Sequence, residues 1–126
     1  MNLVGPINTG VAAGGAGTAT ANASTTQMVS GRVAGIYVRY NDSPPAGTTD
    51  VTVKTVGTSP AAPSYNFLVL TNAATDGWFY PQAQIHDTSG AAIAGEYTPL
   101  LVHDYINVTV AQANNGDSVD VWLLVD

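Results

Sequence analysis

The sequence predicts an all-β protein, folded as a single antiparallel β-sandwich of the jelly-roll kind with about seven or eight strands. Runs in which apolar and polar residues alternate recur along the chain and are separated by turns rich in Gly, Pro and Asn. No window of useful length follows the 3.6-residue period of a helix. Only 10% of the residues are charged, and polarity comes mainly from Thr, Ser, Asn and Gln, which suit strand surfaces better than helical ones.

The clearest strand is Ser30–Tyr40. Every second residue from Ala34 to Tyr40 is apolar, which is typical of a strand with one buried face. A turn at 43–47 follows, because its two prolines remove backbone donors and fix φ. The alternation then resumes over Asp50–Val56, so the two strands and their turn form the unit around which the rest of the chain is organised.

The second half of the chain continues the same pattern. We predict further strands at Tyr65–Thr71, Gln82–Asp87, Leu100–Gln112 and Val119–Val125, with a loop or weak strand at Ala91–Thr98. Tyr65–Thr71 is apolar on both parities, which predicts a central strand covered on both faces. Asp104 interrupts an otherwise apolar face, so we expect a hydrogen-bonded carboxylate and a bulge or kink there. Asn114–Asp117 has the composition of a hairpin turn.

The N-terminal part differs from the rest, because Met1–Gln27 has no aromatic and no charged residue. We expect residues 1–17 to form a flexible Gly/Ala-rich arm and residues 18–126 to form the sandwich. Thr18–Thr26 alternates hydroxyl or amide residues with alanine. Two interpretations of this region stay open: a frayed terminus followed by an edge strand, or an arm donated to another subunit.

The composition excludes several functions. A chain of 126 residues is one domain by size, and with no cysteine it has neither disulfides nor a thiolate nucleophile. The net charge is −6, and the positive side chains are Arg32, Arg39 and Lys54. So few cations predict no nucleic-acid partner and no attraction to an anionic membrane. We also expect no signal peptide and no membrane span.

Two His-Asp dipeptides, His86-Asp87 and His103-Asp104, are the obvious candidates for metal binding or acid–base chemistry. Adjacent side chains on a strand point to opposite faces, so neither dipeptide supplies both groups to one site. A site with one residue from each pair needs those strands to be adjacent, and an enzyme would need His86 and His103 to converge in one pocket. Asn114–Asp120 is rich in oxygen ligands but lacks the spacing of an EF-hand. We therefore expect no catalytic residue, no metal site, no cofactor and no enzymatic activity.

The densest aromatic cluster is Trp78-Phe79-Tyr80. It could form a platform for sugars together with other aromatic residues, or pack in the core, or lie in a subunit contact, where Tyr and Trp are enriched. The other aromatic residues considered for these roles are Tyr37, Tyr40, Tyr65, Tyr97, Tyr105 and Trp122.

Over roughly residues 18–126 the chain resembles the small all-β decoration, or cement, proteins of tailed-phage heads. The residues that carry the resemblance are Ser30–Tyr40 (SGRVAGIYVRY), Ala46–Thr55 (AGTTDVTVKT), Trp78–Pro81 (WFYP), His86–Ile93 (HDTSGAAI), LLVHDYINVTV and SVDVWLLV. The resemblance implies a non-catalytic virion protein, assembled in the host cytoplasm. It implies binding to the outside of the major capsid protein shell, as a homotrimer that stabilises the shell.

This resemblance makes an apolar arm and the aromatic cluster the candidate subunit or capsid contacts. They are Leu3, Val4, Ile7, Trp78, Phe79 and Tyr80. The alternative function is a carbohydrate-binding or receptor-binding module of a phage head or tail fibre, for which the aromatic cluster would be the binding surface.

Overall fold

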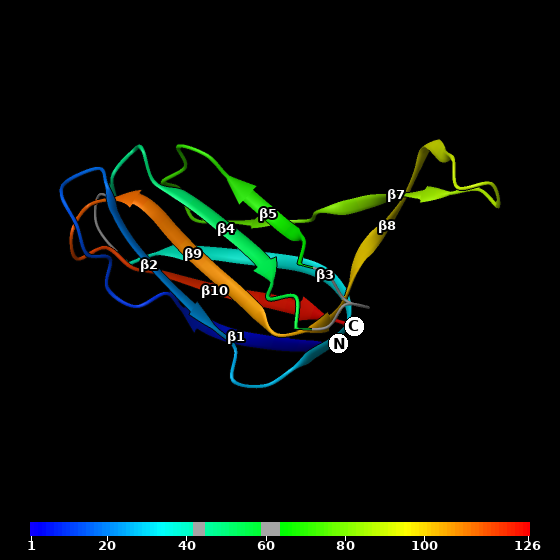
Figure 1. The fold of residues 1–126 in the computed structure, drawn as a ribbon, viewed down its shortest axis with the longest axis horizontal. Helices are drawn as coiled ribbons and strands as arrows, with labels where there is room; N and C mark the ends of the chain where they lie inside the picture. The colour runs from blue at the N-terminus through cyan, green and yellow to red at the C-terminus, as the bar shows by residue number, and fades with distance from the viewer. Residues whose placement is uncertain (42–44, 59–63) are drawn as a thin grey trace.

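A computed structural model describes residues 1–41, 45–58 and 64–126. It contains ten strands in two antiparallel sheets that pack face to face (Figure 1). The strands are β1 (Asn2–Asn8), β2 (Ala19–Ser24), β3 (Val29–Tyr40), β4 (Asp50–Thr55), β5 (Asn66–Leu70), β6 (Gly77–Phe79), β7 (Gln82–His86), β8 (Ala92–Asp104), β9 (Ile106–Ala113) and β10 (Val119–Val125). The described residues contain no helix that could cross a membrane.

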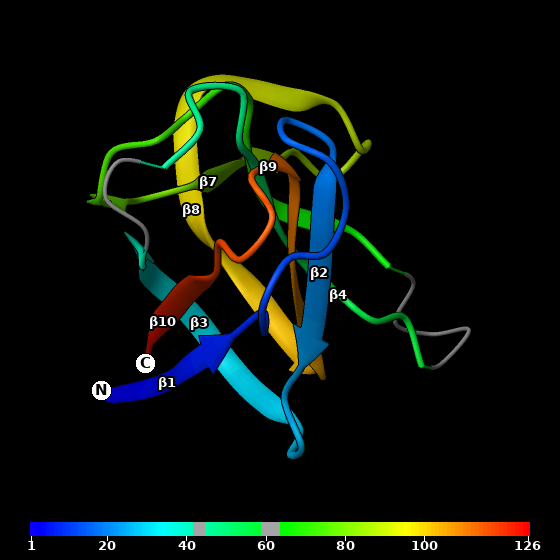
Figure 2. The ribbon, with the colours of Figure 1, turned by 90° about the vertical axis from the view of Figure 1, so that its left-hand side faces the viewer.

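The order of the strands is that of a jelly roll. One sheet contains the series β1-β10-β3-β8, and the other contains β2-β9-β4-β5. Figure 2 shows β2, β4 and β9 in one layer and β1, β10 and β3 in the other. Eight strands split evenly between two sheets define this architecture, and successive strands cross between the layers except for β4 and β5, which pair in one sheet. The predicted all-β sandwich of the jelly-roll kind is therefore confirmed.

The core lies between the two sheets and is built from the inward parity of each strand. Val119, Val121, Leu123 and Val125 are buried, as the alternation in Val119–Val125 predicts. Removing this apolar surface from water is the main contribution to stability in a fold without disulfides. The largest side chains with no exposed surface are Ile36, Ile106, Leu123, Val38, Val51, Val53, Val108, Val110 and Val121.

The N-terminal segment differs from the expected arm. Asn2–Asn8 is strand β1, which pairs with β10 and places Ile7 in the core. The alternation is hidden in the sequence because Gly5 and Pro6 stand in the middle of the strand and the pairing register shifts between Val4 and Ile7. Of the expected arm at residues 1–17, Asn2–Asn8 is thus a strand of the jelly roll, whereas Ala19–Ser24 is an edge strand.

Three other predictions were wrong in detail. Strand β5 is at the edge of its sheet and exposes Val69, so Tyr65–Thr71 is not covered on both faces. Leu100–Gln112 is two strands in different sheets, and the Asn114–Asp117 turn joins different sheets instead of closing a hairpin. The predicted kink at Asp104 is where the chain crosses between sheets. The predicted turn at 43–47 lies partly outside the described residues.

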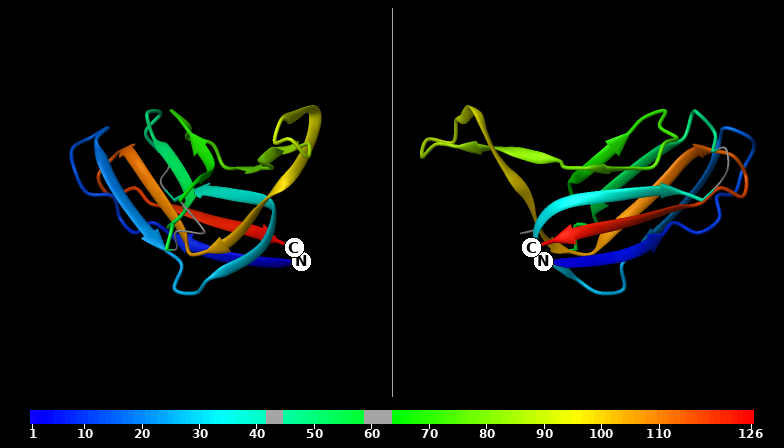
Figure 3. Two further views of the ribbon diagram at one scale, coloured as in Figure 1. Left: turned by 45° about the vertical axis from the view of Figure 1, so that its right-hand side comes forward. Right: turned by 180° about the vertical axis from the view of Figure 1, so that it is seen from behind.

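Residues 77–98 are an addition to the eight-stranded jelly roll. The short strand β6 extends the sheet beside β3, where it pairs with Ile36–Val38. Strand β7 pairs with the first half of β8 to form a two-stranded ribbon that projects from the sandwich (Figure 3). The jelly roll needs neither element to enclose its core, and a function is commonly found on such additions to a shared fold.

Candidate functional site: an aromatic strip on the outer sheet face

Four aromatic side chains form a continuous strip on the outer face of the six-stranded sheet: Tyr37, Trp78, Tyr80 and Trp122. Tyr37 on β3 lies between the other strands, with its ring centroid 5.3 Å from that of Trp78 and 5.7 Å from that of Trp122. The rings of Trp78 and Tyr80 are parallel to within 10°, with centroids 6.3 Å apart. Trp78 is 44% exposed and Tyr80 is 66% exposed. We call this set the aromatic strip.

Two glycines make room for these rings. A Cβ at Gly35 would lie 3.1 Å from Cε1 of Tyr80 and 3.4 Å from Cε3 of Trp78. A Cβ at Gly5 would lie 3.1 Å from Cδ1 of Trp122. The rings therefore contact the sheet where side chains are missing. A side chain at either glycine would displace them.

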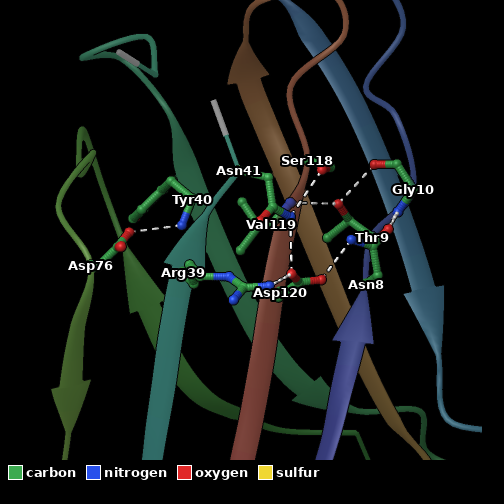
Figure 4. A network of polar contacts seen from close by, with 10 residues as sticks. All are labelled: Asn8, Thr9, Gly10, Arg39, Tyr40, Asn41, Asp76, Ser118, Val119 and Asp120. Atoms are coloured by element: carbon green, nitrogen blue, oxygen red, sulfur yellow. Dashed lines mark hydrogen bonds and ion pairs between the residues drawn. The ribbon is translucent and has the colours of Figure 1, made fainter. Parts of the chain in front are cut away.

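A polar cluster lies beside the strip and is centred on Asp120 of β10 (Figure 4). The Asp120 carboxylate accepts hydrogen bonds from Nδ2 of Asn8 at 2.6 Å, from Arg39 at 2.6 Å and from Nδ2 of Asn41 at 3.1 Å. The Arg39 guanidinium also lies over the Trp122 ring, 4.9 Å from its centroid, which is a cation–π contact. We call Asn8, Arg39, Asn41 and Asp120 the Asp120 cluster.

The ionised form of the Asp120 carboxyl is stabilised by these neighbours. Burial raises the pKa of its carboxyl, but the hydrogen bonds from Asn8, Arg39 and Asn41 and the positive charge of Arg39 outweigh this effect and lower the pKa. The carboxylate is therefore ionised at neutral pH and fixes the Arg39 guanidinium, whose side chain is half-exposed. A ligand on the strip would find aromatic rings beside an oriented guanidinium and amide groups.

The predicted contact residues divide equally between the two faces of their strands. On the outer face are Leu3, Trp78 and Tyr80. Facing the interior are Val4, Ile7 and Phe79. Leu3 is opposite Leu124 and is 58% exposed. The structure thus leaves half of the predicted set available for contact with another molecule.

The two His-Asp dipeptides do not form one site. His86 and Asp87 are at the tip of the ribbon, whereas His103 is on the body of the sheet, where its Nδ1 is 3.0 Å from Oγ of Ser30. Asp104 points to the interior and is bonded to the loop at 57–58. Over residues 1–41, 45–58 and 64–126, no group of three or more His, Cys, Asp or Glu side chains is arranged to hold a metal ion.

Sequence reasoning missed the assembly of the Asp120 cluster. Arg39 and Asp120 are 81 positions apart and meet because β3 pairs with β10. The parity of Arg39 with Tyr37 indicates one face, but nothing local places Trp122 opposite Tyr37. The oxygen-rich run at 114–120 contributes Asp117 to its own turn and Asp120 to the cluster, so it is not one set of ligands.

No family model and no curated protein matches the sequence. Among solved structures, the chain is similar to "CBM32 of AlyQ in complex with 4,5-unsaturated mannuronic acid", with 10% identity and a TM-score of 0.44, covering 88% of this chain and 74% of that one. It is also similar to a mutant of the family 29 carbohydrate-binding module CBM29-2, with 12% identity and a TM-score of 0.39, covering 90% of this chain and 64% of that one. Similarity at this level gives no ground for transferring a ligand.

Proposed function

We propose that this chain is a non-catalytic structural protein of a virus particle, a decoration protein that binds the outside of a major capsid protein shell as a homotrimer and stabilises it. The sequence resemblance supplies the class of protein. The observation that supports attachment is the aromatic strip, half of which, Trp78 and Tyr80, belongs to the addition at 77–98 and is exposed to solvent.

The physical character of the strip suits a protein partner. Tyr and Trp supply large contact areas at low entropic cost and are enriched among residues that dominate binding energy. The strip is surrounded by few charges, and the neighbouring Asp120 and Arg39 already neutralise each other. A net charge of −6 is also compatible with an outer position on the shell, away from packaged nucleic acid.

The test is co-sedimentation with shells that lack this protein, comparing the wild type with the double variant Trp78→Ala/Tyr80→Ala. Losing two central aromatic contacts is expected to weaken binding about 100-fold or more. Val69→Ala is the matched control, because Val69 is 55% exposed on the other sheet. Equal binding by the wild type and the double variant would mean that the strip is not the attachment surface. No binding by the wild type would remove the decoration function.

A second candidate function is carbohydrate binding, and the Asp120 cluster is the observation that favours it. Sugars are held by rings that stack on their apolar face and by fixed polar groups that bind their hydroxyls. The strip has both features, since the exposed rings of Trp78 and Tyr80 lie on the same sheet face as the Arg39 guanidinium, which Asp120 orients. That guanidinium covers one face of the Trp122 ring. Because Asp120 already neutralises Arg39, the cluster favours neither neutral nor acidic glycans by charge.

A glycan array that includes neutral and uronic-acid oligosaccharides tests this candidate. If it is correct, Trp78→Ala weakens the binding of the glycan about tenfold or more, and Gly35→Val also weakens it by displacing Tyr80. Val69→Ala should bind like the wild type. If no glycan on the array binds and the protein does bind to shells, carbohydrate binding is excluded and only the decoration function remains.

A further inference from the structure

The two-stranded ribbon formed by β7 and the first half of β8 contributes no buried residue to the core of the sandwich. Every residue from Gln82 to Leu101 is exposed or half-buried, and Ile93 and Tyr97 are large apolar side chains among them. Strand β7 is the last strand of its sheet, so its outer edge presents unpaired backbone groups. An isolated two-stranded ribbon is marginally stable in water, and such an element therefore gains most from a partner surface.

A groove lies at the opposite edge of the molecule. It has a volume of about 510 Å³ and is located between β1 and the segment from Ala23 to Ser30. Its apolar residues include Val4, Ile7, Met28, Val29 and Val125, and its rim is made of Ser, Thr, Asn and Gln side chains. We call it the edge groove.

The sheet topology separates the ribbon from the edge groove. Strand β1 is at one end of the series β1-β10-β3-β8-β7, and the ribbon strand β7 is at the other end. The ribbon also projects away from the sandwich (Figure 3), so it cannot fold back into the groove of its own chain. A second copy placed beside the first brings the ribbon of one to the groove of the other.

The charges favour a second copy as the occupant. Two chains of charge −6 repel each other, so a contact between them is best made where charge is scarce. No charged side chain is among the described residues that line the groove. At the ribbon tip, the Asp87 carboxylate already accepts hydrogen bonds from N and Oγ of Ser89 and from N of Ala91. The ribbon also carries the exposed carboxylate of Glu96, and neither carboxylate meets a like charge when the ribbon approaches the uncharged groove.

We propose that the β7–β8 ribbon of one copy docks into the edge groove of a second copy. The two contact surfaces are different, so the interaction is head to tail and closes into a ring when the rotation between copies permits. Pro6 lacks a backbone donor, and the register shift in β1 interrupts its edge. The ribbon therefore inserts between β1 and the β2–β3 connection without extending the sheet. This contact does not depend on what the aromatic strip binds.

Cysteine cross-linking tests the contact directly, since the chain has no cysteine of its own. Thr88→Cys is placed at the ribbon tip in one preparation, and Thr26→Cys at the groove rim in another carrying a different tag. Mild oxidation of the mixture is expected to give mainly mixed dimers. In the control, Thr75→Cys replaces Thr26→Cys. Thr75 is exposed in the connection between β5 and β6, and this mixture should give few mixed dimers. The proposal would be overturned if Thr26→Cys and Thr75→Cys gave mixed dimers equally often. It would also be overturned if Thr88→Cys formed dimers only with itself.

A charge placed on the ribbon provides an independent measurement. Ile93→Lys is expected to shift the mass in light scattering from a multiple of 12.9 kDa to the monomer, whereas Val69→Lys should keep the wild-type mass. Both changes add one cation to an exposed apolar position, so net charge is matched. A monomeric wild type at all concentrations, or an assembly that Ile93→Lys leaves intact, would contradict the docking. Shell binding is measured separately and can fail without affecting either result.

Discussion

Replacing Ile36 with alanine is expected to lower the free energy of unfolding by about 2–5 kcal/mol, because the substitution leaves a cavity in a close-packed core. Ile36 has no exposed surface and is in the middle of β3. It is paired with Leu123 on one side and with Phe79 on the other, so the surrounding strands cannot easily collapse into the space.

Urea unfolding followed by circular dichroism measures this loss as a lower midpoint at an unchanged slope. Val69→Ala is the control, since Val69 is mostly exposed and its truncation is expected to change the free energy by no more than about 0.5 kcal/mol. If Ile36→Ala lowered the free energy of unfolding by no more than Val69→Ala does, the packing of β3 against the opposite sheet would not be important for stability. The outer face that carries Tyr37 and Arg39 depends on this strand.

The strands that were predictable from the sequence are those with one face in the core. Val119–Val125 keeps one parity inward throughout, and Ser30–Tyr40 does so from Ile36 to Tyr40, after a register shift that separates these residues from Val33. Both predicted strands agree with β10 and β3 to within one residue. Strand β1 was missed because its glycine and proline conceal two apolar positions. Strand β5 was misjudged because it is apolar on both parities, whereas in a sandwich only one face of each sheet is covered and Val69 lies on the exposed face.

The candidate site was predictable only in part. The aromatic cluster at 78–80 is visible in the sequence, and its alternation separates outward Trp78 and Tyr80 from inward Phe79. Trp122 joins this cluster only because the register between β10 and β3 places Trp122 opposite Tyr37. That register is set by pairing along the two strands and is not visible in local sequence. The ribbon was expected as a short strand followed by a loop or weak strand, because a weakly apolar sequence does not indicate how far a hairpin projects.

Acid is expected to destabilise the protein through aspartates that are hydrogen-bonded in the folded state, and Asp104 is the clearest case. Its side chain is 1% exposed. Its carboxylate accepts hydrogen bonds from N of Gly57 at 2.7 Å, from Oγ1 of Thr58 at 2.9 Å and from N of Tyr105 at 2.7 Å. Burial raises the pKa of this carboxyl, but these hydrogen bonds lower it by more, so the folded-state pKa is below the ordinary value.

The sign of the effect follows from this direction. A carboxyl whose pKa is lowered by folding stabilises the folded state above the unfolded-state pKa of about 3.9, and this contribution is lost as the pH falls toward the folded-state pKa. The free energy of unfolding should therefore be flat near neutral pH and should decline below about pH 4. Asp120 and Asp87, whose carboxyls also have lowered pKa values, contribute in the same direction.

Urea midpoints measured from pH 7 to pH 2.5 test this prediction with Asp104→Asn. The amide cannot accept hydrogen bonds at both of its ends, so the variant is expected to be less stable at pH 7 and to lose less stability on acidification than the wild type. Glu96→Gln removes the same charge from the exposed ribbon and is expected to keep the wild-type decline. An Asp104→Asn curve that runs parallel to the wild type at every pH would show that this carboxylate does not hold the β8–β9 crossing, and that the acid sensitivity arises elsewhere.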